Sequence, residues 1–168
     1  MHLIDKLFLY PGQSVVTKDA MEISTILGSC VSVCLFDSIR CIAGINHFIL
    51  PVNDNGKSDI EKYGDTSLEF MLDKMLSMGS NQRDIVAKVF GGGELLTYKN
   101  SSFNIGKKNI EAAMDFICNH EISVISKAIG GIRGRKIVFN TLTGIVRHQY
   151  IASSKLLSED YLRDSEHQ

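Results

Sequence analysis

The pattern of apolar and polar positions divides the chain into short strands and two helices. Apolar runs rich in β-branched residues, each bounded by glycine, proline or polar residues, predict strands. The run at residues 30–36 is almost continuously apolar, which is typical of a strand buried on both faces. The predicted strands are 13–16, 22–27, 30–36, 41–50, 85–90, 122–129, 136–140 and 145–150.

Two further segments have the spacing of amphipathic helices. In the first, apolar side chains recur at i, i+3, i+4, i+7 and i+8: Leu68, Met71, Leu72, Met75 and Leu76. Thr66 and Glu69 predict a capping box at its start, and Gly79 predicts its end. The second helix is predicted at residues 106–118. Many strands and two helices indicate a mixed α/β class with a sheet-rich core and helices packed outside.

The length and the net charge indicate the number of domains and argue against a nucleic-acid partner. With 168 residues, 44% of them hydrophobic, the chain suffices for one compact domain. We expect a single domain at 1–151 and a polar C-terminal tail at 152–168, where apolar residues become sparse. The formal charge of −1 supplies no basic field for nucleic acid, so no nucleic-acid partner is predicted.

The sequence predicts a cytoplasmic protein without membrane insertion. No apolar stretch approaches the roughly 20 residues that a membrane-spanning helix needs. The N-terminus has an acid ahead of a very short apolar patch and lacks the pattern of a signal peptide. In that compartment the four cysteines are expected to be reduced rather than paired in disulfides.

Three cysteines and a histidine lie within eighteen residues: Cys30, Cys34, Cys41 and His47. Three sulfurs and one imidazole would suit tetrahedral zinc. On a strand, however, Cys30 and Cys34 would stand about 13 Å apart, too far for one metal ion. We therefore predict no metal and no other cofactor, and expect Cys34 and Cys118 to be small buried side chains.

Cys30 follows Gly28 and Ser29, where the strand pattern is interrupted. Glycine permits backbone conformations that other residues avoid, so the thiol could stand at a sharp corner beside free N–H groups. His47 lies on the next predicted strand, and adjacent antiparallel strands could bring its ring to the thiol. The spacing alone leaves two interpretations open: a nucleophilic Cys–His pair, or two core residues satisfied by hydrogen bonds.

Six blocks of sequence, in order, resemble the CheD family, the chemoreceptor glutamine deamidases of chemotaxis. Several ordered blocks are a more specific signal than a single glycine motif. The blocks are STILGSCVSVCLFD at 24–37, GINHFILP at 44–51, YGD at 63–65, AKVFGGG at 87–93, IGKKN at 105–109 and GGIRGRK at 130–136.

The resemblance implies a protein-glutamine glutaminase with an α/β (α+β) sandwich fold related to cysteine deamidase toxins. It implies Cys30 as the nucleophile and His47 as the base and then the acid. The family places a threonine hydroxyl six residues before the cysteine; here Ser24 has that spacing and Thr25 is next to it. Parity along a straight strand favours Ser24, and both residues stay candidates for the third catalytic position.

The resemblance also suggests how the reaction intermediate is held. Backbone N–H groups would stabilise the oxyanion of an attacked amide. The N–H of Cys30 is one candidate donor. A second candidate is the glycine-rich segment at 91–93, whose alternative interpretation is a tight turn.

Partners follow from the same resemblance. It implies methyl-accepting chemotaxis receptors, bound through their cytoplasmic region, and leaves a CheC-type phosphatase open as a second partner. A catalytically silent adaptor that docks to either one is the alternative function. The segment 131–134 resembles the GxxG loop of RNA-binding KH domains, but it lies between predicted strands and is interpreted as a glycine turn with solvated Arg and Lys side chains.

Overall fold

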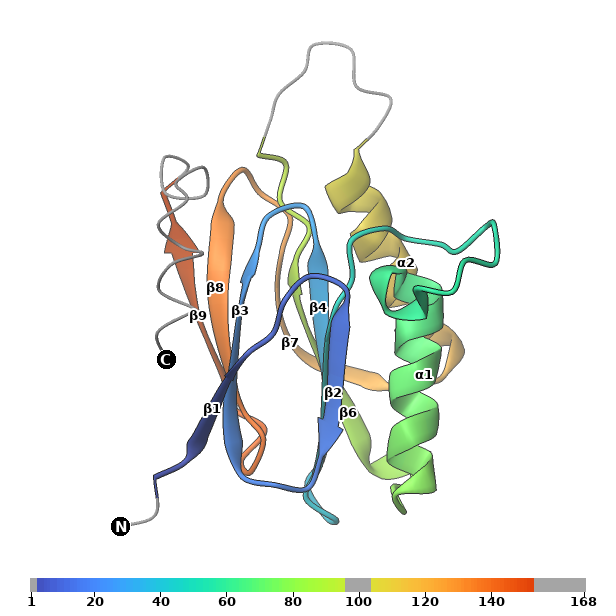
Figure 1. Cartoon of the computed structure of the whole chain (residues 1–168), viewed down its shortest axis with the longest axis vertical. Coiled ribbons are helices and arrows are strands. Elements are labelled where there is room, and N and C mark those ends of the chain that lie inside the picture. The colour runs from blue at the N-terminus through green and yellow to red at the C-terminus, as the bar shows by residue number, and fades with distance from the viewer. Residues whose placement is uncertain (1–2, 96–103, 153–168) are drawn as a thin grey trace.

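Two β-sheets packed face to face, with two helices outside one of them, form the fold (Figure 1). The computed structural model describes residues 3–95 and 104–152. The four-stranded sheet has the order β1 (Asp5–Phe8), β3 (Met21–Leu27), β8 (Gly134–Asn140) and β9 (Val146–Ile151). The five-stranded sheet has the order β2 (Gln13–Thr17), β5 (Ile42–His47), β4 (Val31–Asp37), β6 (Ile85–Gly91) and β7 (Ser123–Ile129).

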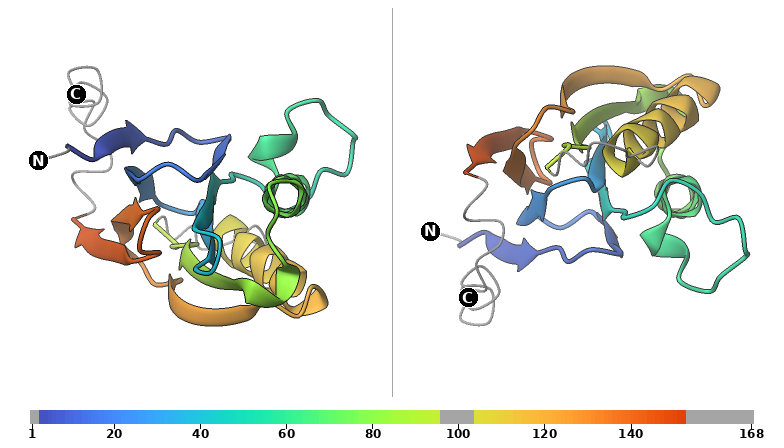
Figure 2. Two further views of the ribbon diagram at one scale, coloured as in Figure 1. Left: turned by 90° about the horizontal axis from the view of Figure 1, so that it is seen from below. Right: turned by 90° about the horizontal axis from the view of Figure 1, so that it is seen from above.

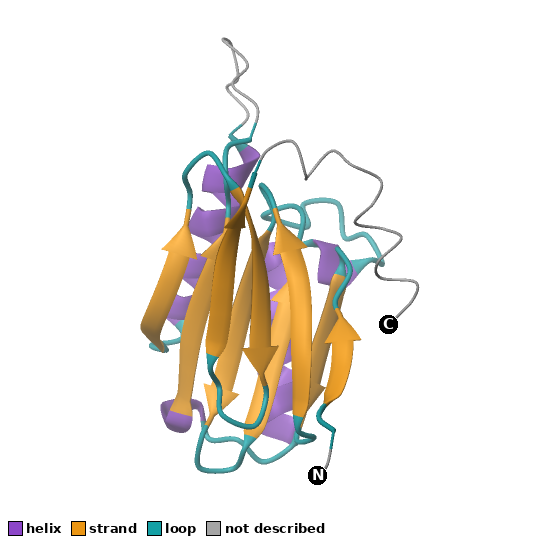
Figure 3. Cartoon of the chain, turned by 90° about the vertical axis from the view of Figure 1, so that its left-hand side faces the viewer, coloured by secondary structure: helices purple, strands orange, loops and turns teal. Residues whose placement is uncertain are grey.

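Both sheets are mixed. The pairs β1–β3 and β6–β7 are parallel, and the other named pairs are antiparallel. Helices α1 (Gly64–Ser77) and α2 (Ile105–Asn119) cover the outer face of the five-stranded sheet (Figure 2). Two short 3-10 helices, η1 (Ile60–Lys62) and η2 (Gln82–Asp84), precede α1 and β6. Among the described residues, no helix covers the outer face of the four-stranded sheet (Figure 3).

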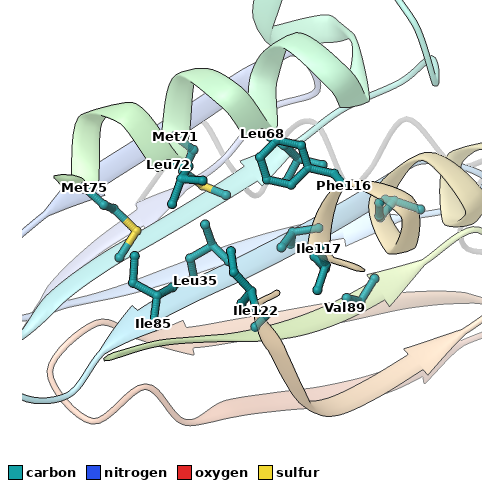
Figure 4. Close-up of a cluster of buried hydrophobic side chains, with 14 of the residues drawn as sticks. Leu35, Leu68, Met71, Leu72, Met75, Ile85, Val89, Phe116, Ile117 and Ile122 are labelled. Carbon is teal, nitrogen blue, oxygen red and sulfur yellow. The ribbon is translucent and has the colours of Figure 1, made fainter. Parts of the chain in front are cut away.

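The alternation along β4 creates two hydrophobic layers because neighbouring side chains of a strand point to opposite faces. Val33 and Leu35 of β4 face the helices and form one buried cluster with residues of α1 and α2. Figure 4 shows Leu35 in this cluster with Leu68 and Met71 of α1. Cys34 and Phe36 face the four-stranded sheet, in a second core shared with β3 and β8. Every residue of β4 is buried, as the continuous apolar run predicts.

The sheet-rich sandwich with helices outside is confirmed, and each predicted strand is present with bounds shifted by a few residues. Strand β1 was not predicted, because its four residues are short and mostly exposed. Within the described residues, no helix is long and apolar enough to cross a membrane. The division at residue 151 stays a prediction, and the tail beyond Ala152 lies outside the described residues.

The predicted capping box is wrong. Helix α1 begins at Gly64, two residues before Thr66, and Tyr63 occupies the capping position without a side-chain bond. The hydroxyl of Thr66 instead donates a hydrogen bond of 2.5 Å to the carbonyl of Ile60 in η1. The helix starts earlier because η1 leads directly into it, and Gly79 ends it with a positive φ of 108°.

Candidate active site

Residues 28–30 carry the chain from one sheet to the other, since β3 belongs to the four-stranded sheet and β4 to the five-stranded sheet. Three successive carbonyls of this corner accept hydrogen bonds. The N–H of Gly93 donates to Gly28 and that of Gly92 to Cys30, both at 2.8 Å. The side-chain amide of Asn109 donates to Ser29 at 3.0 Å. These three bonds fix the corner from which Cys30 projects.

Gly28 leaves room for a neighbouring side chain rather than adopting an unusual backbone conformation. Its φ lies outside the positive region, so the prediction of a glycine-only conformation is wrong. A Cβ at this position would stand 2.7 Å from Cδ1 of Leu95. Leu95 therefore packs directly onto the backbone of the corner, and a larger residue than glycine would displace it.

The register of the sheet brings Cys30 and His47 to one face. Val31 pairs with Phe48 and Cys34 with Ile45, so Ser32 stands opposite His47. Cys30 is two residues from Ser32 and therefore shares this face with His47. Its partly exposed side chain packs against the core between the sheets.

Thr25 reaches His47 across the gap between the sheets. Its hydroxyl donates to the carbonyl of Leu9 at 2.6 Å and lies 2.8 Å from Nδ1 of His47. A hydroxyl has one hydrogen, which Leu9 already receives, so at His47 the threonine oxygen accepts and Nδ1 carries the proton. The tautomer is thereby fixed, and the lone pair of the imidazole is on Nε2.

Ser24 does not occupy this position. Alternate residues of β3, Ile23, Thr25 and Leu27, are buried against the five-stranded sheet, whereas Ser24 points to the other face and is only partly buried. The parity argument fails because the chain changes sheets between β3 and β4, so alternation along β3 does not continue to Cys30.

Burial favours the neutral forms of both the Cys30 thiol and the His47 imidazole. Burial raises the pKa of the Cys30 thiol to about 11, against the opposing effect of its own backbone N–H. Burial lowers the pKa of His47 to about 4, against the smaller opposing effect of the Leu9 carbonyl. Nε2 of His47 is buried and has no hydrogen-bond partner among the described residues. Both pKa shifts oppose a preformed thiolate–imidazolium pair.

His47 should make the fold sensitive to mild acid. In the unfolded chain His47 takes up a proton near pH 6.5, whereas in the folded protein it does so only near pH 4. Its contribution to the free energy of unfolding is therefore complete above pH 6.5 and is lost as the pH falls to 4. The shift corresponds to about 3 kcal/mol.

The test compares urea unfolding of the wild type and His47→Gln at several pH values from 7 to 4. Glutamine does not titrate, so the variant should lose less stability over this interval, although it is less stable at pH 7. If the free energy of unfolding fell equally in the two proteins between pH 7 and pH 4, His47 would titrate normally in the fold.

At Gly92 and Gly93 the glycine-rich segment has no free N–H group to offer as an oxyanion donor. The N–H groups of Gly92 and Gly93 are engaged with the carbonyls of Cys30 and Gly28. Gly91 and Gly92 have positive φ values of 106° and 69°, in agreement with the alternative interpretation of a tight turn. The backbone N–H of Cys30 remains the candidate donor, and it lies close enough to its own thiol to lower that pKa.

The other cysteines take no part in this arrangement. Cys34 is fully buried between the sheets, as predicted, whereas Cys118 is exposed rather than buried. Cys41 is exposed and lies in the turn between β4 and β5, at the opposite end of these strands from Cys30 and His47. Within residues 3–95 and 104–152, no group of three His, Cys, Asp or Glu side chains could hold a metal ion.

The loop that resembles a GxxG motif has a structural role. Arg133 and Lys136 are exposed, as predicted for a solvated turn. Arg135 is instead completely buried, and its guanidinium donates to the carbonyls of Ala128, Gly130 and Arg133. The glycines form a turn held from within by an arginine, which the charge pattern could not reveal.

Comparison with known proteins gives three findings. Residues 49–150 match the model of the CheD family, described as chemotactic sensory transduction. The chain is 43% identical over 143 residues to a protein of Trichlorobacter lovleyi named probable chemoreceptor glutamine deamidase CheD, covering 85% of this chain and 89% of that relative. A protein of the same name from Sulfurimonas denitrificans is 34% identical over 152 residues, covering 90% and 97% of the two chains.

Among solved structures, the hypothetical protein YfiH of Bacillus licheniformis matches 68% of this chain and 49% of its own, at 16% identity and a TM-score of 0.47. A likeness at this level carries no argument about function. The expected relation to cysteine deamidase toxins stays a prediction.

Proposed function

We propose that this chain, which belongs to the CheD family, converts glutamine side chains of chemoreceptors to glutamate through a covalent intermediate on Cys30. The hydrogen bond between Thr25 and His47 carries the proposal, because it leaves the Nε2 lone pair free on the face that Cys30 shares. The names of the relatives from Trichlorobacter lovleyi and Sulfurimonas denitrificans support the substrate class.

In the first half of the reaction, Nε2 of His47 takes the thiol proton of Cys30 as the sulfur attacks Cδ of the glutamine. The two pKa values oppose a resting ion pair, so the proton moves as the carbon–sulfur bond forms. The N–H of Cys30 donates to the oxyanion of the tetrahedral intermediate. The imidazolium then gives its proton to the leaving nitrogen, ammonia departs, and a thioester remains.

In the second half, water replaces ammonia. His47 removes a proton from a water molecule as its oxygen attacks the thioester carbon, and the Cys30 sulfur leaves. The imidazolium returns its proton to the sulfur, and the released side chain is a glutamate. Thr25 holds the ring in one tautomer throughout, so the same nitrogen serves as base and acid in both halves.

The direct test is mass spectrometry of a receptor cytoplasmic fragment incubated with the protein. Each converted glutamine should gain about 1 Da, because an NH2 group is replaced by OH. A parallel incubation with His47→Gln controls for spontaneous deamidation. Fragments that stay unchanged while the protein is folded would argue against the proposed function.

Two further expectations rest on the family resemblance. A CheC-type phosphatase is proposed as a second partner, and the cytoplasmic region of the receptor is proposed as the part that is modified. Co-purification of the full chain with each candidate, compared with an unrelated cytoplasmic protein, tests both.

A further inference from the structure

Asn109 connects the two segments that carry the reacting groups. It lies in α2, its side chain is fully buried, and its amide nitrogen donates two hydrogen bonds. One bond, of 3.0 Å, goes to the carbonyl of Ser29 immediately before Cys30. The other, of 2.9 Å, goes to the carbonyl of Ile49, two residues after His47.

The bond to Ser29 fixes the direction of the N–H group of Cys30. No peptide bond of the described residues is cis, so the Ser29 carbonyl and the Cys30 N–H point in opposite directions from one plane. Helix α2 covers the outer face of the five-stranded sheet, and the carbonyl is directed toward it. The N–H is therefore directed inward, toward the face that the Cys30 thiol and His47 share.

We propose that Asn109 is a positioning residue that holds the Ser29–Cys30 peptide in the orientation in which the Cys30 N–H can stabilise the oxyanion. This inference rests on the proposed deamidation. Without the amide, the Ser29 carbonyl would lose its partner, and rotation of the peptide plane would turn the N–H away from the reacting carbon.

Gly92 and Gly106 explain how α2 comes close enough to the corner for Asn109 to reach the Ser29 carbonyl. A Cβ at Gly106, in the first turn of α2, would stand 2.6 Å from the carbonyl oxygen of Gly92. A Cβ at Gly92 would meet the side chain of Ile110 at 2.4 Å. Backbone thus packs on backbone here, which brings the short side chain of Asn109 within reach of the corner.

The chemistry of Asn109 also points to a specific role. Its oxygen, Oδ1, is buried and has no hydrogen-bond partner among the described residues. An unpartnered buried oxygen opposes folding, so an amide is an unfavourable choice where only the space has to be filled. Its nitrogen, in contrast, is fully used by the two carbonyls.

The experiment uses Asn109→Leu, which keeps the approximate volume and removes both donors. Loss of one oxyanion donor typically lowers kcat by about 100-fold or more, and we expect a reduction of that order with KM changed less than about twofold. The matched control is Ala113→Gly, one helical turn further along the buried face of α2. It weakens the helix without touching the corner.

A second measurement separates positioning from general loosening. The alkylation rate of Cys30 by iodoacetamide at pH 8, followed by mass spectrometry of its peptide, reports the fraction of thiolate. If the N–H turns away, the thiolate loses a donor and the rate should fall at least about threefold. A corner that merely becomes loose would expose the thiol and react faster.

The turnover and the alkylation rate together test whether Asn109 orients the Ser29–Cys30 peptide. A selective fall in kcat together with slower alkylation, neither of them seen in Ala113→Gly, supports the proposal. Equal effects of the two substitutions on kcat, or faster alkylation in Asn109→Leu, would overturn it. If the wild type deamidates no receptor fragment, the proposed function fails, and the alkylation rate alone still decides whether Asn109 orients the peptide.

Discussion

Replacing Cys30 with alanine is expected to lower the rate of ammonia release by about three orders of magnitude or more. Alanine has no sulfur to form the thioester, and His47 cannot compensate because it acts only on protons in the proposed mechanism. The fold should persist, since Cys30 is partly exposed and precedes β4 rather than lying within it. Ammonia release and circular dichroism measure the two effects separately.

Cys34→Ala is the matched control, because Cys34 lies on the same face of β4 and is completely buried. Its replacement leaves a void in the core between the sheets, so the melting temperature should fall while kcat stays close to the wild-type value. A fully active Cys30→Ala protein, or a folded Cys34→Ala protein without activity, would place the nucleophile elsewhere.

The elements of the fold could be predicted from the sequence where burial dictates the pattern. β4 is apolar at nearly every position because it is covered on both faces, and the inward face of α1 repeats with helical spacing. β1 has neither signal, since within the described residues it is an edge strand paired with β3 and is mostly exposed. Its existence depends on a long-range pairing that local sequence does not encode.

The site could be predicted only as far as residues that are close in sequence. Cys30 immediately precedes β4 and His47 ends β5, and because these two strands pair directly, the proximity follows from a hairpin. Thr25 requires knowledge of which sheet each strand joins, and straight-strand parity led to Ser24 instead. Asn109 gave one usable signal, a polar residue within the buried face of a predicted helix, but its partners Ser29 and Ile49 lie 80 and 60 residues away.

Thr25→Val is the second substitution for which we expect a large effect, a reduction in kcat of about 100-fold or more with KM little changed. Valine has nearly the same shape, so packing between the sheets is retained. Without the hydroxyl oxygen, the buried Nδ1–H of His47 loses the acceptor that fixes its tautomer, and the tautomer with the proton on Nε2 becomes accessible. That tautomer presents a donor to Cys30 where the reaction needs a base.

Two companion variants test this explanation. Thr25→Ser keeps the hydroxyl and should retain most of the activity, and Ser24→Ala should retain nearly all of it, because Ser24 faces away from His47. The histidine tautomer can be followed by nitrogen NMR of the imidazole, which should report Nδ1 protonation in the wild type and Thr25→Ser but not in Thr25→Val. If Ser24→Ala reduced kcat and Thr25→Val did not, the bond between Thr25 and His47 would have no part in catalysis. If neither substitution reduced kcat, the catalytic residues would be a Cys30–His47 dyad without a third member.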